Sequence, residues 1–356
     1  MFYFHRKQLH YTLLLCILLL ISGCTSISYY AQSIRGQFEV INKSQTIDNV
    51  VNNPDTDHEL RDQLNTVLNI RSFSIEELGL PDNKSYLSYS DLKRDYVVWN
   101  IFATKEFSLE PIQSCFILVG CLDYRGFFSK EDAEAYAAKL AAQGMETYLG
   151  GVSAYSTLGW FNDPVLNTML KWSEARLAAV IFHELTHQLF YIKGDTEFNE
   201  SLADAIGIIG VRAWFKYSGQ QDKLAAYEDY LEREDTFVQL VLKYKTLLEE
   251  LYNKDISPDL MRQQKANIYQ RMRKEYSEMS KHWQHDYYGN WIKYRLNNAS
   301  MASVVSYRKY LSAFLELYKL GNEDIHQFYE NVRTLLRCPQ DQRAKILNFS
   351  IDDFSC

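Results

Sequence analysis

The feature that most constrains the fold is a pair of histidines four positions apart in the apolar stretch Ile181-Phe-His-Glu-Leu-Thr-His-Gln-Leu-Phe190. An α-helix turns about 100° per residue, so side chains four positions apart lie on one face. His183 and His187 can therefore reach the same metal ion from one helix. Two imidazoles leave a metal site incomplete. This helix therefore requires a second element that carries a further ligand.

The segment Phe198-Asn-Glu-Ser-Leu-Ala-Asp204 is expected to be that second element. With Gly194-Asp195 as its turn, the connector is long enough to reverse the chain and bring an antiparallel helix back past the metal. Glu200, near the start of this helix, is the expected third ligand. Asp204 lies one turn further on the same face, where its carboxylate can accept the free N–H of a liganding histidine. Small residues that would let the helices pack closely are Ala203, Ala205, Gly207 and Gly210.

This arrangement predicts one Zn²⁺ per chain, held by His183, His187 and Glu200. The fourth position is open to a water, whose pKa falls towards about 7 on zinc. Glu184 is the expected general base, which would take a proton from the attacking water and deliver it to the leaving amine. Together these residues give the H-E-x-x-H pattern of zinc hydrolases. The alternative is that the histidines only pack within a buried helix.

A zinc peptidase also needs a group that stabilises the oxyanion, usually a tyrosine or histidine from elsewhere in the chain. We favour Tyr307 as this catalytic residue, because it follows the polar segment Leu296-Asn-Asn-Ala299 at a helix start that could face the cleft. Most of the 26 tyrosines must serve packing. The other candidates are Tyr155, Tyr191, His282, His285, Tyr288 and Tyr294.

The part of the chain before the motif has a mixed pattern of strands and one helix. An Ala-rich stretch over residues 129–143 predicts a helix that ends at Gly144. The expected strands, which are rich in β-branched and aromatic residues, are 95–107, 114–119 and 145–149. A sheet of this kind would support the two metal helices.

Residues 150–160 are rich in glycine and precede the histidines by a few tens of residues. An extended peptide can bind by pairing with the edge of a sheet, and glycines let it approach the backbone closely. One interpretation is therefore an edge strand that binds substrate through Gly151, Val152 and Tyr155. The other is a glycine-rich hairpin without a ligand.

From residue 173 onward the pattern is almost entirely helical, including one long helix expected over 298–320. The whole chain therefore predicts an α+β fold that is mostly α-helical, with a small mixed sheet. A hydrophobic content of 47% is ample for a substantial core. The expected divisions are a signal segment over 1–23, a helical N-terminal module over 24–83, a sheet with the metal helices over 84–219, and a helical C-terminal portion over 220–356 that closes the cleft.

The N-terminus resembles a bacterial lipoprotein signal. Arg6 and Lys7 precede an apolar run over residues 11–21, and Ile21-Ser-Gly-Cys24 places small residues before a cysteine. We expect cleavage before Cys24, which would then carry the lipid and tether the chain in the cell envelope. Thr25 at the next position favours the outer membrane, with the protein facing the periplasm. The alternatives are a signal without lipid and an ordinary membrane anchor.

Cysteine usage agrees with export to an oxidising compartment. Cys16 would be lost with the signal and Cys24 would be lipidated, which leaves an even number of cysteines. Four cysteines allow three pairings. We favour the two pairs that are near in sequence, Cys115 with Cys121 and Cys338 with Cys356.

Seven segments resemble the bacterial family described as "putative aminopeptidase", a group of predicted zinc lipoproteins. They are Tyr29-Tyr-Ala-Gln-Ser-Ile-Arg-Gly-Gln37, Glu77-Leu-Gly-Leu-Pro-Asp-Asn-Lys-Ser-Tyr86, Tyr96-Val-Val-Trp-Asn100, Phe107-Ser-Leu-Glu-Pro111, Tyr124-Arg-Gly126, Ala154-Tyr-Ser-Thr-Leu-Gly-Trp-Phe161 and Gly194-Asp-Thr-Glu-Phe-Asn-Glu-Ser201. The resemblance covers nearly the whole mature chain. It implies a gluzincin-type zinc peptidase with a zincin-like core, in which His183, Glu184, His187 and Glu200 take their usual roles.

The resemblance alone supplies the aminopeptidase label. The chain has no match to the Gly-Ala-Met-Glu-Asn motif by which well-known zinc aminopeptidases hold the amino terminus of a substrate. Family members also often lack an acidic residue at the position of Asp204. Exopeptidase action is therefore expected only from the resemblance. The role of Asp204 is expected only from its position on the helix.

Three functions fit these patterns. The first is a zinc peptidase that acts on peptides at the envelope. The second is a catalytically idle lipoprotein whose zinc braces two helices and whose surface binds an envelope partner. The third is an amidase that cleaves a non-peptide amide, such as a cell-wall fragment. The net charge of -7 disfavours nucleic acid as a partner, because phosphate binding depends on clusters of Lys and Arg.

Overall fold

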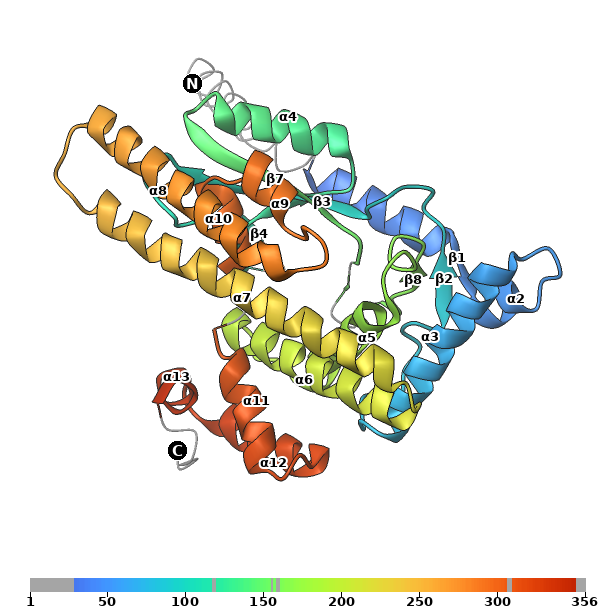
Figure 1. Cartoon of the computed structure of the whole chain (residues 1–356). Coiled ribbons are helices and arrows are strands. Elements are labelled where there is room, and N and C mark those ends of the chain that lie inside the picture. Colours follow the sequence, from blue (N-terminus) through green and yellow to red (C-terminus); the bar gives the residue numbers. More distant parts are fainter. Residues whose placement is uncertain (1–28, 117–119, 155, 158–160, 306–308, 350–356) are drawn as a thin grey trace, which may run out of the picture.

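Helices make up most of the structure and the strands form small sheets, which confirms the expected α+β class (Figure 1). The computed structural model describes residues 29–349 apart from 117–119, 155, 158–160 and 306–308. The expected signal segment and Cys24 lie outside these described residues. Within the described residues, none of the helices is both long enough and apolar enough to cross a membrane.

The two helices of the metal motif lie antiparallel and in contact. α5 spans Glu174–Leu189, and α6 spans Thr196–Tyr217. The connector between them includes Gly194 at a φ of 86°, a left-handed conformation that favours glycine. Asp195 then caps α6 by accepting the backbone N–H of Phe198. The turn that the sequence predicts therefore lies at the predicted residues.

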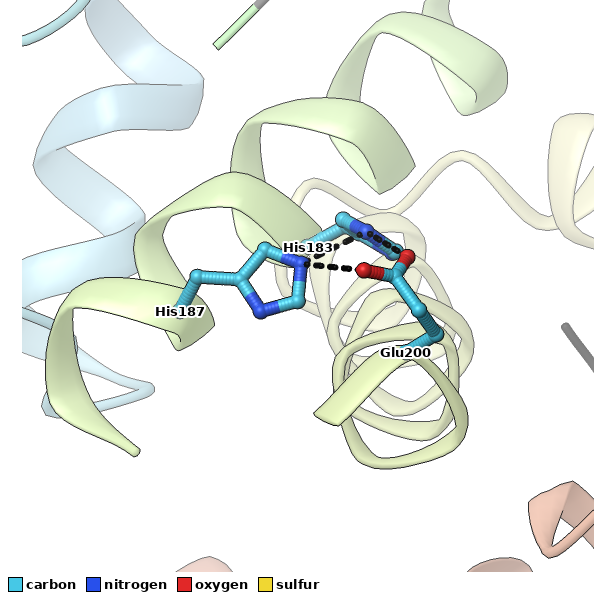
Figure 2. Close-up of side chains that lie close together, drawn as sticks. All are labelled: His183, His187 and Glu200. Carbon is cyan, nitrogen blue, oxygen red and sulfur yellow. Dashed lines mark hydrogen bonds and ion pairs between the residues drawn. The ribbon is translucent and has the colours of Figure 1, made fainter. Parts of the chain in front are cut away.

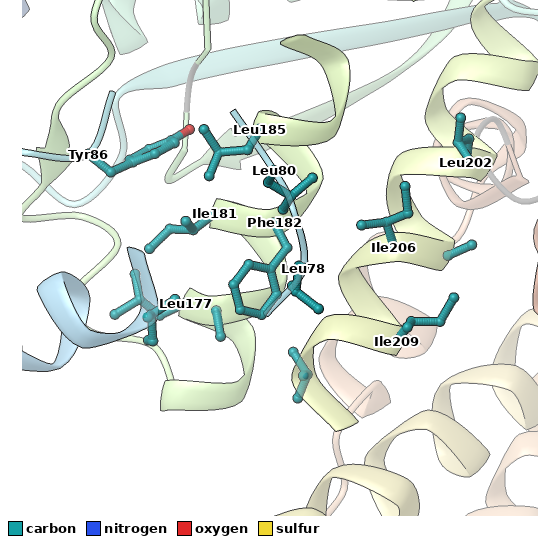
Figure 3. Packing of buried hydrophobic residues seen from close by; sticks show 14 of the residues in the cluster. Leu78, Leu80, Tyr86, Leu177, Ile181, Phe182, Leu185, Leu202, Ile206 and Ile209 are labelled. Atoms are coloured by element: carbon teal, nitrogen blue, oxygen red, sulfur yellow. The ribbon is translucent and has the colours of Figure 1, made fainter. Parts of the chain in front are cut away.

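Two glycines on α6 allow its close approach to α5. A Cβ on Gly207 would lie 3.1 Å from the backbone oxygen of Ala179, and one on Gly210 would lie 2.5 Å from the ring of Phe182. Figure 3 shows this apolar contact, with Leu78 from an earlier part of the chain packed against the same helices. The predicted role of the small residues on α6 is therefore found at these two positions.

The two longest strands lie in an antiparallel sheet with the strand order β6-β3-β7. Its strands are β6 (Arg125–Phe127), β3 (Val98–Lys105) and β7 (Met145–Val152). β7 continues past the predicted end at residue 149, so Gly150 and Gly151 lie within the strand, opposite Asn100 and Trp99. β7 is an edge strand, as one of the two sequence interpretations expected.

The other sheets are built from strands of two or three residues. A three-stranded sheet contains β1 (Ser44–Thr46), β2 (Ser88–Ser90) and β8 (Val165–Leu166), and a hairpin contains β4 (Ser114–Phe116) and β5 (Gly120–Leu122). The strand predicted over 114–119 is confirmed over Ser114–Phe116, residues 117–119 lie outside the described part of the chain, and β5 pairs antiparallel with β4. A disulfide joins Cys115 to Cys121, which are opposite each other in this hairpin. The other expected pair includes Cys356, which lies outside the described residues.

The helices before the metal motif surround these sheets. They are a helix over residues 29–42, α2 (Ile47–Val51), α3 (His58–Glu76) and α4 (Lys130–Ala141). α4 begins at the cap Ser129 and precedes Gly144, which has a φ of 79°. The N-terminal portion is not purely helical, because β1 lies within it.

The C-terminal half is helical, as predicted, but the single helix expected over 298–320 is wrong. The helices are α7 (Gln221–Tyr252), α8 (Pro258–Met279), the 3₁₀ turn η1 (Ser280–His282), α9 (Gly289–Tyr294), α10 (Asn298–Val305), α11 (Leu311–Leu320), α12 (Ile325–Arg337) and α13 (Gln340–Phe349). Met301 of α10 is buried in a core with α7 and α8, whereas Phe314 of α11 is buried in the core around α6. Two separate helices allow the segment to reach both cores.

A buried ion pair fastens the last helix to the start of α6. Arg343 on α13 donates to the carboxylate of Asp195 at 2.6 Å and to the carbonyl of Cys338 at 2.6 Å. Its guanidinium also lies 5.3 Å from the ring centre of Phe198. Asp195 therefore serves both as the cap of α6 and as the partner of a buried cation.

Replacing Arg343 by Ala should lower the free energy of unfolding by about 3 kcal/mol, because it leaves a buried carboxylate without its cation. Urea unfolding followed by circular dichroism measures this. The control Lys319→Ala removes an exposed ion pair with Glu316 and should change the free energy by less than about 0.5 kcal/mol. Equal effects of the two substitutions would contradict the role given to Arg343.

Candidate metal centre

Three side chains from the two antiparallel helices converge on one point (Figure 2). The Nε2 atoms of His183 and His187 lie 3.1 Å apart. The carboxylate of Glu200 lies 3.4 Å from Nε2 of His183 and 3.5 Å from Nε2 of His187. The structure therefore brings together the three residues that the sequence predicts as ligands.

The spacing of these atoms fits a metal ion. In a tetrahedral site with bonds of about 2.0–2.1 Å, ligand atoms lie about 3.3–3.4 Å apart. The three distances in the centre fall close to this value. Two nitrogen atoms and one carboxylate oxygen, each directed at the same space, form a donor set that could hold a metal ion.

The second nitrogen of each histidine has a different environment. Nδ1 of His183 lies 2.8 Å from the carboxylate of Asp204, which can accept a hydrogen bond from the Nδ1–H group. This hydrogen bond leaves the lone pair of Nε2 directed at the centre. Nδ1 of His187 is buried and has no partner among the described residues. Asp204 is therefore placed where the sequence expects it, whereas His187 has no matching carboxylate.

The surroundings shift the pKa values of the two imidazoles in opposite directions. Burial and, after it, the neighbouring His183 lower the pKa of His187 to about 4. Burial also lowers the pKa of His183, but hydrogen bonds to Asp204 and Glu200 outweigh burial and raise this pKa well above its usual value. The two imidazoles therefore differ in their affinity for a proton, and the difference follows from the carboxylates that contact His183.

Glu184 is adjacent to the ligand His183 on α5, and its carboxylate is contacted by a residue from the segment after β7. Its half-buried carboxylate forms a hydrogen bond with the hydroxyl of Ser156, and burial raises its pKa above the usual range. The same hydroxyl lies 3.0 Å from the carboxylate of Asp163. A side-chain hydroxyl carries one proton, so Ser156 links two carboxylates and can donate to one of them at a time.

The connector that delivers Glu200 is closed by its neighbour Asn199. The amide oxygen of Asn199 accepts the backbone N–H of Ile192 at 2.9 Å, and its amide nitrogen donates to the carbonyl of Ile192 at 2.8 Å. This pair of hydrogen bonds fixes the chain just before α6 begins. Asn199 therefore supports the ligand that follows it.

The loop over residues 80–86 lies against the metal helix. Buried Arg71 on α3 donates to the carbonyls of Pro81, Asn83 and Ser85. The amide of Asn83 in turn donates to Gln188, the residue after His187. An arginine in the buried face of α3 is the sequence signal that could have revealed this loop as more than a turn.

Tyr86 ends this loop in an unusual conformation. Its φ is 62°, which is rare for a large side chain and costs about 1–3 kcal/mol. The side chain is buried, and Figure 3 shows its hydroxyl directed towards α5 near Leu185. Burial, followed by the charges of Glu184 and Asp163, raises the pKa of Tyr86 well above its usual value.

The predicted substrate residues Gly151 and Val152 lie in β7, opposite Trp99 and Val98. The ring of Tyr96 covers Gly151, because a Cβ there would lie 2.5 Å from the ring. The predicted partner Tyr155 lies outside the described residues. The sequence therefore predicts the position of the strand, but it gives no sign that the ring of Tyr96 lies over Gly151.

The candidates for oxyanion stabilisation lie in different places. Tyr307, the preferred one, lies outside the described residues, as does Tyr155. Tyr191 is 54% exposed, and its ring centre lies 6.5 Å from that of His187. Tyr288 instead stacks on Phe237 in the second core, with ring centres 3.9 Å apart. The remaining candidates, His282, His285 and Tyr294, are exposed around η1 and α9.

Replacing Asp204 by Asn should weaken Zn²⁺ binding about 10- to 100-fold, because the histidine loses the carboxylate that orients it. Competition with a chelating dye measures the dissociation constant. The matched control is Asp222→Asn in the exposed first turn of α7, which should bind Zn²⁺ like the wild type. An unchanged constant for the Asp204 variant would contradict its role.

Comparison with known proteins agrees with the resemblance of the sequence segments. A family model described as "Putative aminopeptidase" matches residues 28–347, which include both metal helices and the loop over residues 80–86. No curated protein and no solved structure matches the chain. Because the match covers most of the sequence, the chain belongs to the putative aminopeptidase family.

Proposed function

We propose that the protein is a zinc-dependent peptidase that hydrolyses peptide bonds with Glu184 as general base. The observation that carries this proposal is the convergence of His183, His187 and Glu200 on one point, with Glu184 beside them. The family description supports a peptidase. A metal site that only braced two helices would have no use for Glu184, which is not one of the three ligands.

The donor set favours zinc at a catalytic site. Structural zinc sites usually have four protein ligands, whereas catalytic sites have three, such as two histidines and a glutamate, with one position left open. The described residues supply three ligands, His183, His187 and Glu200. A zinc ion held by them would supply Lewis-acid chemistry and a water of lowered pKa.

The residues of the chain would divide the remaining work. Glu184 would accept the proton of the attacking water and then give it to the leaving amine. Asp204 would hold the imidazole of His183 in the tautomer that presents Nε2. For oxyanion stabilisation we propose Tyr307 or, beside His187, Tyr191.

We propose that the peptide backbone of the substrate binds along the edge of β7. Its neighbour in the sheet is β3, so the other side of the strand is an edge. Near its start this edge is occupied by Asn297, whose amide donates to the carbonyl of Thr147 at 2.9 Å. Gly151 and Val152 lie at the opposite end of the strand. The chain continues from there to Ser156, which contacts Glu184 on α5. An extended peptide there would pass the base.

Glu184→Gln should abolish cleavage of a peptide library, by at least about a thousandfold in kcat, while one zinc per chain is retained. Mass spectrometry of the products and metal analysis by plasma emission measure the two effects. Cuts one residue from the amino terminus would establish an aminopeptidase, and internal cuts would establish an endopeptidase. A wild-type protein that binds zinc and cleaves nothing would contradict the proposal.

We also propose that the mature chain is an envelope lipoprotein, anchored through Cys24 in the outer membrane. The signal sequence supports this. So does the helix over residues 29–42, which starts five positions after that cysteine and exposes Ile34, Phe38 and Ile41. Its other side packs on the protein, where Gly36 faces the ring of Phe128. Exposed apolar side chains so close to a lipid would suit contact with a membrane surface.

Cys24→Ser should abolish incorporation of radiolabelled palmitate and release the protein from the membrane fraction, because the acyl chains provide the anchor. Labelling of cells followed by fractionation measures this. The matched control Cys16→Ser should leave both properties unchanged, since that residue lies within the signal. Membrane association that survives the Cys24 substitution would favour an uncleaved anchor instead.

A further inference from the structure

We propose that Asp163 is a positioning residue that fixes the carboxylate of Glu184 through the hydroxyl of Ser156. This inference rests on the proposed function, because it concerns the base of that reaction. Asp163 belongs to none of the patterns that predict the centre, and it reaches the base from the chain between β7 and β8.

The carboxylate of Asp163 organises the segment that contacts the base. One oxygen accepts the hydroxyl of Ser156 and the backbone N–H of Thr157, both at 3.0 Å. The other oxygen accepts the hydroxyl of Thr157 at 2.8 Å. Two of these hydrogen bonds, both from Thr157, hold the segment in place whichever way the hydroxyl of Ser156 is turned, and that hydroxyl can direct its one proton to Asp163 or to Glu184. The link from Asp163 to the base contains a single intervening side chain.

The backbone of Asp163 makes a second connection to the same place. Its carbonyl accepts the N–H of Tyr86 at 2.7 Å. Tyr86 is the strained residue at the end of the loop that Arg71 holds, and its buried side chain lies close enough to Glu184 to feel its charge. Strain of this kind persists where the surroundings determine the conformation, and it gathers at active sites. Asp163 thus joins two segments that border the base.

The burial of Asp163 is hard to explain by stability alone. Its exposed fraction is 2%, and within the described part of the chain it forms no ion pair. Burial raises the pKa of this carboxyl above its usual range, despite the hydrogen bonds that lower it. A buried carboxylate without a cation lowers stability. Such costs are tolerated at functional sites, where they secure a geometry that the reaction needs.

The test uses full-length mature protein loaded with zinc and three substitutions. Asp163→Asn keeps the shape but removes the negative charge and one of the two acceptor oxygens, so the hydroxyl of Ser156 is held by a weaker acceptor. Ser156→Ala removes the link, and Ser156→Thr restores a hydroxyl. The matched control is Glu146→Gln, which alters a partly buried carboxylate paired with Lys265 at the far end of β7.

We expect Asp163→Asn and Ser156→Ala to lower kcat about 10- to 100-fold, with KM and zinc content unchanged, because a base displaced by about 1 Å loses reactivity. Ser156→Thr should recover most of the activity. In the Glu184→Gln background, Asp163→Asn should cause no further loss, since both substitutions act through one group. Glu146→Gln should lower the melting temperature and leave kcat unchanged.

Binding of acetohydroxamic acid to the zinc-loaded protein, measured by calorimetry, gives a second readout that needs no turnover. The hydroxamate would hydrogen-bond to Glu184, so Asp163→Asn and Glu184→Gln should weaken its binding by similar factors, and Glu146→Gln should not. If the wild type binds zinc and hydroxamate but cleaves no peptide, the proposed peptidase function fails, and this comparison still decides the role of Asp163.

Three outcomes would overturn the inference. Asp163→Asn could lower only the melting temperature and leave kcat and hydroxamate binding unchanged, which is the behaviour of a structural residue. It could lower zinc content, which would place its effect on the ligands. Finally, its effect could persist in full in the Glu184→Gln background, which would show that it acts through another group.

Discussion

The candidate metal centre depends on how closely two helices approach each other. Its ligands come two from α5 and one from α6, so any separation of the helices would pull Glu200 away from the histidines. The approach is possible because Gly207 lies against the backbone of Ala179 and Gly210 lies against the ring of Phe182. A side chain at Gly210 would require the ring of Phe182 to move, and one at Gly207 would require the backbone of Ala179 to shift by a few tenths of an ångström. Metal–ligand distances vary by only about 0.2 Å, so shifts of this size would matter to a metal site.

Around this contact, polar groups fix each functional side chain from a different part of the chain. Asp204 on α6 orients His183, Asn199 closes the connector before Glu200, and Arg71 on α3 holds the loop that touches α5. Glu184, the proposed base, is contacted by Ser156 in the segment after β7. The site is therefore not the property of one motif. It requires helices, a sheet edge and two loops to be in place together.

The sequence predicts the local part of this arrangement well. Helical periodicity and the spacing of His183, His187 and Glu200 are sufficient to predict two helices whose three donor side chains converge, because helical faces and the short connector are local features of the sequence. Asp163 and Tyr86 were missed, because they meet the base only through tertiary contacts and neither lies in a periodic pattern. The sequence around these two residues therefore gives little indication of their position until the fold is known.

Similar reasons explain the errors in the fold. The segment over 298–320 has the pattern of one helix, but its halves are buried in different cores, so tertiary packing overrides the local preference. β1, β2 and β8 are too short to show an alternating pattern. In contrast, β7 was recognised because it contains enough β-branched and aromatic residues, although its end was placed too early.

The contact between Arg343 and Asp195 has a consequence for the order in which the two helices become stable. Asp195 caps the helix that carries Glu200, and its cation is contributed by α13, 148 positions later in the chain. During synthesis, α5 and α6 are therefore complete long before Arg343 has been added, and Asp195 lacks its cation until then. Variants shortened before α13 would keep the whole H-E-x-x-H helix but would lose the cation that steadies the start of its partner helix.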